Sequence, residues 1–246
     1  MFNIFKTKTT EIIRLTTSRR LDQALIKAGI EDPETVTSLT INGILMKADI
    51  KFIRRKMGKT LQELNIFNTS LEEGKLSRGA FARCIGLVSV ALPNYISKIT
   101  DSTFRNCISL KSVTIPQSVT KIGELAFWGC IELASVTIPN SVTELEFRAF
   151  NNCISLKSVV IPNSVVKIGG SAFGNCSGLT SINIPDSVTE IGNGAFANCT
   201  GLASIAIPQS VVKIGEWVFT GCNIVVSVHP NNPFYASEGG TLIRKY

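Results

Sequence analysis

The seven cysteines of this chain recur every 23 residues, and there are no others. They stand at Cys84, Cys107, Cys130, Cys153, Cys176, Cys199 and Cys222. Phenylalanine keeps the same step three residues earlier, from Phe81 to Phe219, and proline keeps it from Pro93 to Pro208. A fixed period of this length is typical of stacked units that each contact only their neighbours. The sequence therefore predicts a solenoid and not a globular domain built around a pocket.

One unit spans residues 108–130, and its apolar residues occupy columns that the other units share. Residues 110–115 read L-x-x-V-x-I, with the alternation of a half-buried strand. Pro116 ends this strand or marks its edge, because proline has no N–H to donate to a ladder.

The second half of the unit is shorter and more irregular. Val119 and Ile122 predict a second extended piece, and the glycine column at Gly123 predicts a turn with unusual backbone angles. Residues 126–130 are expected to form a tight helical turn that fills the core.

The full motif, L-x-x-V-x-I-P-x-S-V-x-x-I-G-x-x-A-F-x-x-C, recurs over residues 77–222. It resembles the BspA-like leucine-rich repeats of bacterial surface and secreted proteins. The resemblance implies a leucine-rich repeat solenoid, mostly β with short helical turns. It also implies a non-enzymatic scaffold for adhesion or for protein–protein or protein–glycan interaction. The chain departs from ordinary leucine-rich repeats because serine holds the column of the asparagine ladder: Ser118, Ser141, Ser164, Ser187 and Ser210.

Residues 1–76 do not follow the repeat, and we expect a small α/β cap there. Strands are expected at residues 12–15 and 36–41, with a leucine-rich-like strand at 61–66. Ser18 can cap a first helix that ends at Lys27, before Gly29. A second helix is expected near residues 48–57, and its inner face would comprise Ile50, Ile53 and Met57.

The regular units end at Cys222, and residues 223–246 are expected to form a C-terminal cap or an incomplete unit. Val225 and Val228 keep the strand columns by sequence spacing. The turn-rich stretch that follows predicts a hairpin-like cover, with Phe234 and Tyr235 packed onto the last repeat.

The net charge of +7 is concentrated in the N-terminal third. Residues 1–83 carry 15 Lys and Arg against 9 Asp and Glu, chiefly through Lys51, Arg54, Arg55, Lys56 and Lys59. Two interpretations are open: an anionic partner, or the solvated face of a capping helix. We favour the second, and without a nucleic-acid motif we expect no nucleic-acid partner.

The cysteine column raises the question of disulfide or metal chemistry. Side chains in register run parallel, and seven cysteines cannot all pair. The chain has no C-x-x-C pair and a single histidine, His229, which we expect at the surface. The column is therefore predicted to hold buried thiols that fill space or donate weakly to backbone carbonyls. We expect no catalytic residue, metal or cofactor.

Localisation follows from the resemblance and not from a targeting signal. No apolar run approaches the roughly 20 residues that a membrane span needs, and the first residues lack a signal-peptide pattern. Either the protein works inside the cell, or a signal has been removed. The resemblance implies an extracellular or cell-surface protein that binds a protein or glycan on host or neighbouring cells. The cytoplasmic alternative is an interaction or regulatory module, and in both cases we expect a monomer.

Four residues break the repeat in a way that core packing does not require. They are Trp128, Phe147, Arg148 and Trp217, which stand where sibling units have mostly small residues. Aromatic residues and arginine are favoured at binding hot spots. We expect Trp128, Phe147 and Arg148 to form one recognition patch on adjacent units. The alternative is ordinary lateral packing.

Overall fold

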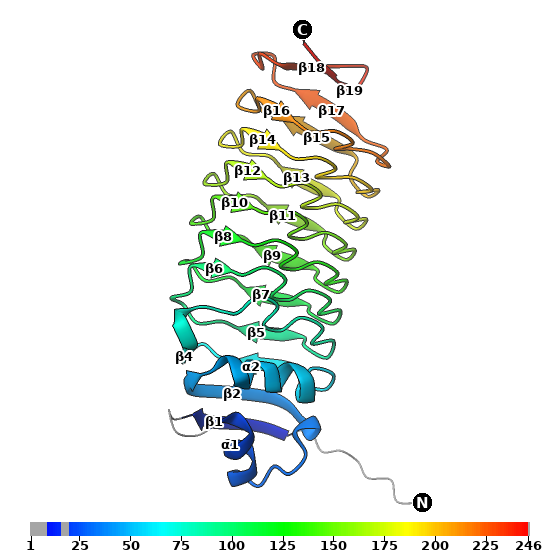
Figure 1. The fold of residues 1–246 in the computed structure, drawn as a ribbon. Coiled ribbons are helices and arrows are strands. Elements are labelled where there is room, and N and C mark those ends of the chain that lie inside the picture. The colour runs from blue at the N-terminus through cyan, green and yellow to red at the C-terminus, as the bar shows by residue number, and fades with distance from the viewer. Residues whose placement is uncertain (1–8, 16–19, 246) are drawn as a thin grey trace, which may run out of the picture.

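The computed structural model describes residues 9–15 and 20–245, which form a stack of coils (Figure 1). The main strands rise in one column, here called the strand wall, and pair in parallel. The register is one repeat as far as residue 183, and the last two strands form a separate parallel pair with a shorter offset. These strands are β5 (Ser89–Ala91), β7 (Ser112–Thr114), β9 (Ser135–Thr137), β11 (Ser158–Val160), β13 (Ser181–Asn183), β15 (Ser204–Ile207) and β17 (Val225–Val228).

Shorter strands form a second parallel wall, in which each coil again pairs with its neighbours (Figure 1). They are β6 (Lys98–Ile99), β8 (Lys121–Ile122), β10 (Glu144–Leu145), β12 (Lys167–Ile168), β14 (Glu190–Ile191) and β16 (Lys213–Ile214). Both extended pieces that the repeat predicts are confirmed.

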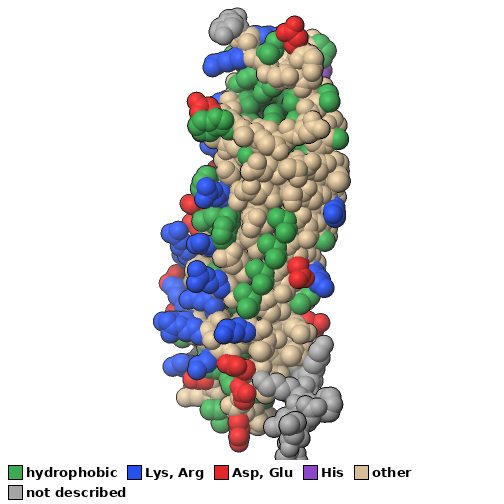
Figure 2. Space-filling model, turned by 90° about the vertical axis from the view of Figure 1, so that its right-hand side faces the viewer, with side chains coloured by type: hydrophobic (Ala, Val, Ile, Leu, Met, Phe, Trp, Pro, Cys, Tyr) green, Lys and Arg blue, Asp and Glu red, His purple; other side chains and the backbone are tan. Residues whose placement is uncertain are grey.

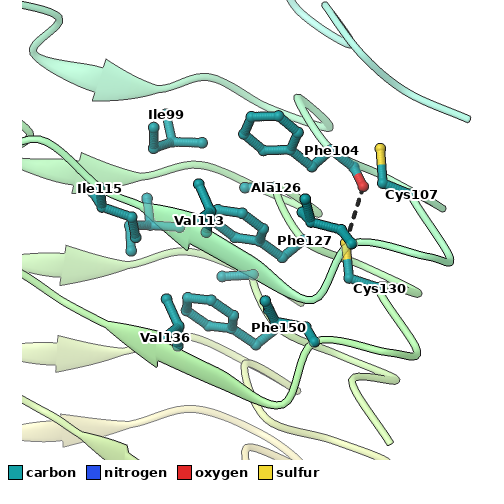
Figure 3. Close-up of a cluster of buried hydrophobic side chains, with 14 of the residues drawn as sticks. Ile99, Phe104, Cys107, Val113, Ile115, Ala126, Phe127, Cys130, Val136 and Phe150 are labelled. Atoms are coloured by element: carbon teal, nitrogen blue, oxygen red, sulfur yellow. Dashed lines mark hydrogen bonds between the residues drawn. The ribbon is translucent and has the colours of Figure 1, made fainter. Parts of the chain in front are cut away.

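The core between the walls consists of repeated apolar columns (Figure 3). The phenylalanine rings stack from coil to coil, with centroids 5.1 Å apart between Phe127 and Phe150 and an interplanar angle of 1°. Phe127 is fully buried. Every coil has a phenylalanine at the equivalent position. Adjacent coils therefore bury each other's apolar surface, as a solenoid requires.

The third side of each coil is the turn wall, which in the coil of residues 108–130 comprises residues 123–130. It consists of successive β-turns, so the predicted helical turn is wrong. The N–H of Cys130 donates to the carbonyl of Phe127 within the turn, whereas the N–H of Phe127 donates to the carbonyl of Ala149 on the next coil. Leu125 has a φ of 57°, which interrupts any helix at that point.

The glycine column has a different cause from the one predicted. Gly123 is not among the residues with positive φ. A Cβ atom there would lie 2.8 Å from the carbonyl oxygen of Ile99 on the preceding coil. Glycine is therefore required by the close approach of two backbones, and the left-handed conformation falls two residues later.

An α/β unit covers the N-terminal end (Figure 1). Its elements are β1 (Thr9–Leu15), α1 (Leu21–Lys27), η1 (Pro33–Thr35), β2 (Val36–Leu45), α2 (Lys47–Phe52), η2 (Ile53–Met57), β3 (Glu63–Asn65), β4 (Thr69–Leu71) and η3 (Glu72–Gly74). The predicted strands and helices are confirmed, and Ile50, Ile53 and Met57 are buried as expected.

The predicted helix cap, Ser18, lies outside the described residues. At the start of α1, the carboxylate of Asp49 accepts the N–H of Leu21 at 2.8 Å. Asp49 also accepts the N–H of Met46 at 3.0 Å, so one buried carboxylate serves the first turns of both α1 and α2.

The C-terminal cover is a hairpin of β18 (Tyr235–Glu238) and β19 (Thr241–Arg244), as predicted. Tyr235 is buried, and its hydroxyl accepts the N–H of Ile214 at 2.8 Å. Phe234 is 43% exposed, so the prediction that it packs onto the last repeat is wrong.

The register of the last strand also differs from the prediction. Val226 pairs with Ile205 and occupies the buried column, while Val225 is exposed. Ile205 and Val226 are 21 residues apart, two fewer than the 23-residue period. Val226 therefore occupies the position that is buried in the other coils.

Candidate functional site

The cysteine column is part of the core. The thiol of Cys130 donates to the carbonyl of Phe104 on the preceding coil, with the sulfur 3.1 Å from the oxygen (Figure 3). Burial raises the pKa of this thiol well above its usual range and raises that of Cys84 to about 12. Cys222, at the end of the stack, is only half-buried. From Cys107 to Cys199, each thiol is buried and donates to a backbone carbonyl of the preceding coil.

The turn wall contains two columns of residues with left-handed backbone conformation. The first holds Arg83, Asn106, Gly129, Asn152, Asn175, Asn198 and Gly221. The second holds Gly79, Ser102, Leu125, Arg148, Ser171, Gly194 and Trp217. A left-handed conformation costs about 1–2 kcal/mol for a residue that carries a Cβ and is not Asn or Asp. Two of the four candidate residues, Arg148 and Trp217, therefore occupy strained positions.

Phe147 and Arg148 form one exposed unit on the turn wall. The guanidinium carbon of Arg148 lies 4.8 Å from the centre of the Phe147 ring, a cation–π distance. The Phe147 ring lies against Gly170 of the next coil, where an added Cβ would be 3.3 Å from the ring. Phe147 nevertheless remains 44% exposed, so lateral packing covers only part of its surface.

Trp128 makes a second arginine–aromatic pair, with Arg105 of the preceding coil. The guanidinium carbon of Arg105 lies 5.0 Å from the centre of the indole. The sequence prediction did not include Arg105 as a site residue. Its position 23 residues before Trp128 is the signal that could have found it, because equivalent positions stack.

The backbone joins the two pairs on adjacent coils. The N–H of Trp128 donates to the carbonyl of Leu125, and the N–H of Leu125 donates to the carbonyl of Phe147. We refer to Arg105, Trp128, Phe147 and Arg148 as the aromatic–arginine patch. Within the described part of the chain, no ring contact joins Trp128 to Phe147.

Trp217 lies apart from this patch. It occupies the same column as Arg148 but three coils further along the stack, which corresponds to about 14 Å at a strand spacing of about 4.8 Å. Its side chain is 69% exposed. The structure therefore separates Trp217 from the other three candidates.

Beside the patch, an ion network links the second wall to Glu146. The Glu146 carboxylate lies 2.8 Å from the ammonium of Lys121 and 3.3 Å from that of Lys98. Glu144 also pairs with Lys121, at 2.8 Å, and the hydrogen bonds that Lys121 donates to Glu144 and Glu146 raise its pKa. These carboxylates are neutralised by lysines, so they join neighbouring coils electrostatically.

The remaining candidate chemistry lies on the surface. His229 is exposed, as expected, and its Nδ1 accepts the N–H of Asn231 at 3.2 Å. Within residues 9–15 and 20–245, no group of three or more His, Cys, Asp and Glu side chains is placed to hold a metal ion. Over the same residues, no helix has the length and apolar character of a membrane span.

The family model of the BspA type leucine-rich repeat region matches residues 74–203 and 166–237, in six copies. The chain belongs to the BspA-type leucine-rich repeat family. This family assignment implies a repeat scaffold for protein interaction. The comparison with curated proteins gives no match.

Solved structures of bacterial leucine-rich repeat proteins have a similar fold. A leucine-rich repeat protein from Bacteroides ovatus is 30% identical over 65% of this chain, with a TM-score of 0.60. The pneumococcal vaccine antigen PcpA is 29% identical over 65% of this chain, with a TM-score of 0.51. The matches span 42% and 40% of those two chains, so this chain matches less than half of each relative's length.

Proposed function

We propose that this BspA-type protein is a non-enzymatic adhesion scaffold that binds a protein or glycan on host or neighbouring cells. The aromatic–arginine patch is the contact surface, and the rest of the stack holds it in a fixed geometry. The protein acts as a monomer at the bacterial surface or after secretion.

The observation that carries this proposal is the conformation of Arg148. Its φ of 55° is one that glycine adopts without strain, and glycine occupies the equivalent position at Gly194. Arginine there is strained, is exposed, and contributes nothing to the core. Backbone strain that the fold does not need is concentrated at functional sites. A surface role for the Arg148 side chain accounts for its presence.

The chemistry of the patch fits molecular recognition. Aromatic rings and guanidinium groups together supply apolar contact area, cation–π attraction and several directed N–H donors. Trp128 is half-buried and Phe147 is 44% exposed, so each is anchored to the stack while it presents part of its ring to a partner. Both pairs are held on rigid turns, which limits the loss of side-chain entropy on binding.

The likeness to a vaccine antigen supports a location at the cell surface, where antibodies can reach a protein. The alternative location is the cytoplasm, where the same patch would serve a regulatory partner. A secretion signal encoded in the gene of this protein would favour the surface location, and retention in the cytoplasmic fraction would contradict it.

The test is an array of glycans and extracellular-matrix proteins probed with two variants. In the patch variant, residues of sibling coils replace the candidates: Trp128→Thr, Phe147→Gly and Arg148→Ser. The matched control is Trp217→Gly, which removes an aromatic that is more exposed than Phe147 and lies outside the patch.

We expect the patch variant to lose at least tenfold in affinity for the partner that the array identifies, and the control to bind normally. Unchanged binding together with a lower melting temperature in the patch variant would show that these residues serve packing. Enzymatic turnover of an arrayed glycan would contradict the scaffold proposal.

A further inference from the structure

A second surface, at the N-terminal end of the stack, is lined by basic side chains. Figure 2 shows Lys and Arg side chains gathered along the left edge of its lower half, at the height of α2 and the first coils. Three cavities of about 360, 150 and 400 Å³ lie there, and each shares lining residues with the next. We call this continuous surface the basic groove. Its cationic lining comprises Arg20, Lys47, Lys51, Arg54, Arg55, Lys56, Lys75, Arg78 and Lys98.

Carboxylates offset part of this charge, and two of them come from outside the lining: Asp22 pairs with Arg20 at 3.5 Å and Glu146 pairs with Lys98 at 3.3 Å. The acidic residues that line the groove are Glu73 and Asp101. Glu73 already pairs with Lys47 at 2.6 Å and with Lys75 at 3.5 Å, and Asp101 pairs with Lys98 at 3.3 Å. Among the described residues, Lys51, Arg55 and Lys56 have no carboxylate within 4.0 Å. The centre of the groove therefore carries unneutralised positive charge.

Local structure explains why these cations share one surface. Ile53 and Met57 are both fully buried at the two ends of the π-helical turn η2. The three residues between them form the outer arc of this wide turn, which places a run of basic residues away from the core. Arg54 is fixed further, because its Nη1 donates to the carbonyl of Gly79 at 2.8 Å.

We propose that the basic groove binds an acidic polysaccharide, one that carries sulfate or uronate groups along an extended chain. Clusters of lysine and arginine of this density fit linear polyanions, including nucleic acids and heparin-like chains. The groove is elongated, since adjoining cavities run from Arg20 to Lys98. This site is distinct from the aromatic–arginine patch and does not depend on the function proposed for it.

The structure favours a polysaccharide over nucleic acid. Single-stranded nucleic acid is held by a row of aromatic side chains on which bases stack. The one aromatic residue that lines the groove is Phe52, and it is half-buried. Proteins that read duplex DNA place a helix or a two-stranded β-ribbon in the major groove. Here α2 has six residues, and Ser77, Arg78 and Ala80 of the first coil line the cavity beside it.

The groove also lacks the features of a membrane-binding surface. Peripheral proteins insert large apolar side chains between lipid headgroups. None of the large hydrophobic residues that are exposed in the described part of the chain lines the groove.

The test measures binding of a fluorescent heparin decasaccharide to the full chain at about 0.15 M salt. The groove variant replaces Lys51, Arg55 and Lys56 with Gln, and all three side chains are exposed. The matched control replaces Lys111, Lys157 and Lys213 with Gln, which removes the same charge elsewhere on the surface. A single-stranded DNA oligonucleotide, phosphatidylserine vesicles and a desulfated decasaccharide are the competing probes.

We expect the groove variant to weaken heparin binding about tenfold, since each exposed ion pair contributes modestly, and the control to change it less than twofold. The desulfated probe should bind more weakly, and the aromatic–arginine patch variant should bind heparin normally. No binding of heparin, equal losses in the two variants, or tighter binding of DNA or vesicles would overturn the proposal. If the groove variant melts at a lower temperature, Lys56→Glu alone is compared with Lys157→Glu under the same criteria.

Discussion

The two left-handed columns of the turn wall share one backbone conformation but hold different residues. The column of Asn152 contains four asparagines, two glycines and Arg83. Asparagine and glycine adopt positive φ most readily, so that column follows the needs of the backbone. The column of Arg148 also holds leucine and tryptophan, for which the same conformation is strained.

The difference separates residues that the backbone conformation favours from residues that it does not. In the Asn152 column, a side chain can also bond along the stack, since Nδ2 of Asn198 donates to Oδ1 of Asn175 at 2.9 Å. In the Arg148 column, Arg148 and Trp217 are exposed, and Leu125 is half-buried. The first column can be explained by folding alone, and the second cannot.

The largest loss of stability is expected for a substitution in the buried phenylalanine stack. Phe127→Ala should lower the free energy of unfolding by about 3–5 kcal/mol, because it leaves a cavity between two rings. Those rings, Phe104 and Phe150, have centroids 5.3 and 5.1 Å away. Urea unfolding followed by circular dichroism measures the loss.

The control for this prediction is Phe219→Ala. Phe219 is only partly buried and stacks on Phe196 alone, at 6.0 Å. Its loss should be clearly smaller. Equal losses at Phe127 and Phe219 would show that the stack does not set the stability of the coils.

Alkaline pH should destabilise the protein through the cysteine column. In the unfolded chain, thiols ionise above a pKa of about 8.5, whereas burial raises the pKa of folded Cys130 well above this range. The unfolded state then binds fewer protons, so the free energy of unfolding falls as pH rises. The expected slope is about 1.4 kcal/mol per pH unit for each buried thiol. For Cys84, the fall in the free energy of unfolding ends once the pH passes the pKa of the folded thiol, which is about 12.

Urea unfolding at a series of pH values from about 8 to 11 checks this prediction, within the window set by the thiol pKa values. Cys130→Ala should make the slope shallower by about 1.4 kcal/mol per pH unit. Cys222→Ala should change it less, because Cys222 is half-buried. An unchanged slope in Cys130→Ala would contradict the burial of ionisable thiols in the core.

A smaller effect is expected at the column that serves the backbone. Asn152 has a φ of 63°, and Asn152→Val places a β-branched residue in a left-handed conformation. The free energy of unfolding should fall by about 1–2 kcal/mol. Asn152→Gly, which tolerates this conformation, should remain within a few tenths of a kcal/mol. If valine is tolerated as well as glycine, the contrast between the two columns loses its basis.

The repeat predicted the strand walls and the core because each coil meets the same packing problem. Phe127 and Cys130 are buried for the same reason as their counterparts, so one period determines their environment. Glycine was harder to interpret, since close backbone approach and positive φ favour the same residue. At Gly123 the cause is close approach, and only three-dimensional contacts distinguish the two.

The ends of the stack and the surface sites were less predictable. Val226, and not Val225, enters the core column because the last coil is two residues shorter than the repeat. The sequence spacing alone does not show at which point of the coil the two residues are missing. The partner of Trp128, Arg105, could have been found from the period. The basic groove could not, because Arg20 and Arg78 approach the same surface from distant parts of the sequence.

The most direct test of the account is the stability of Arg148→Gly. If Arg148 is held in its conformation for a partner and not for the fold, glycine should leave the free energy of unfolding unchanged or raise it by up to about 1 kcal/mol. Urea unfolding of the variant and the parent chain under identical conditions gives the answer. A loss of 1 kcal/mol or more would show that the side chain stabilises the coil and would contradict the functional interpretation of the patch.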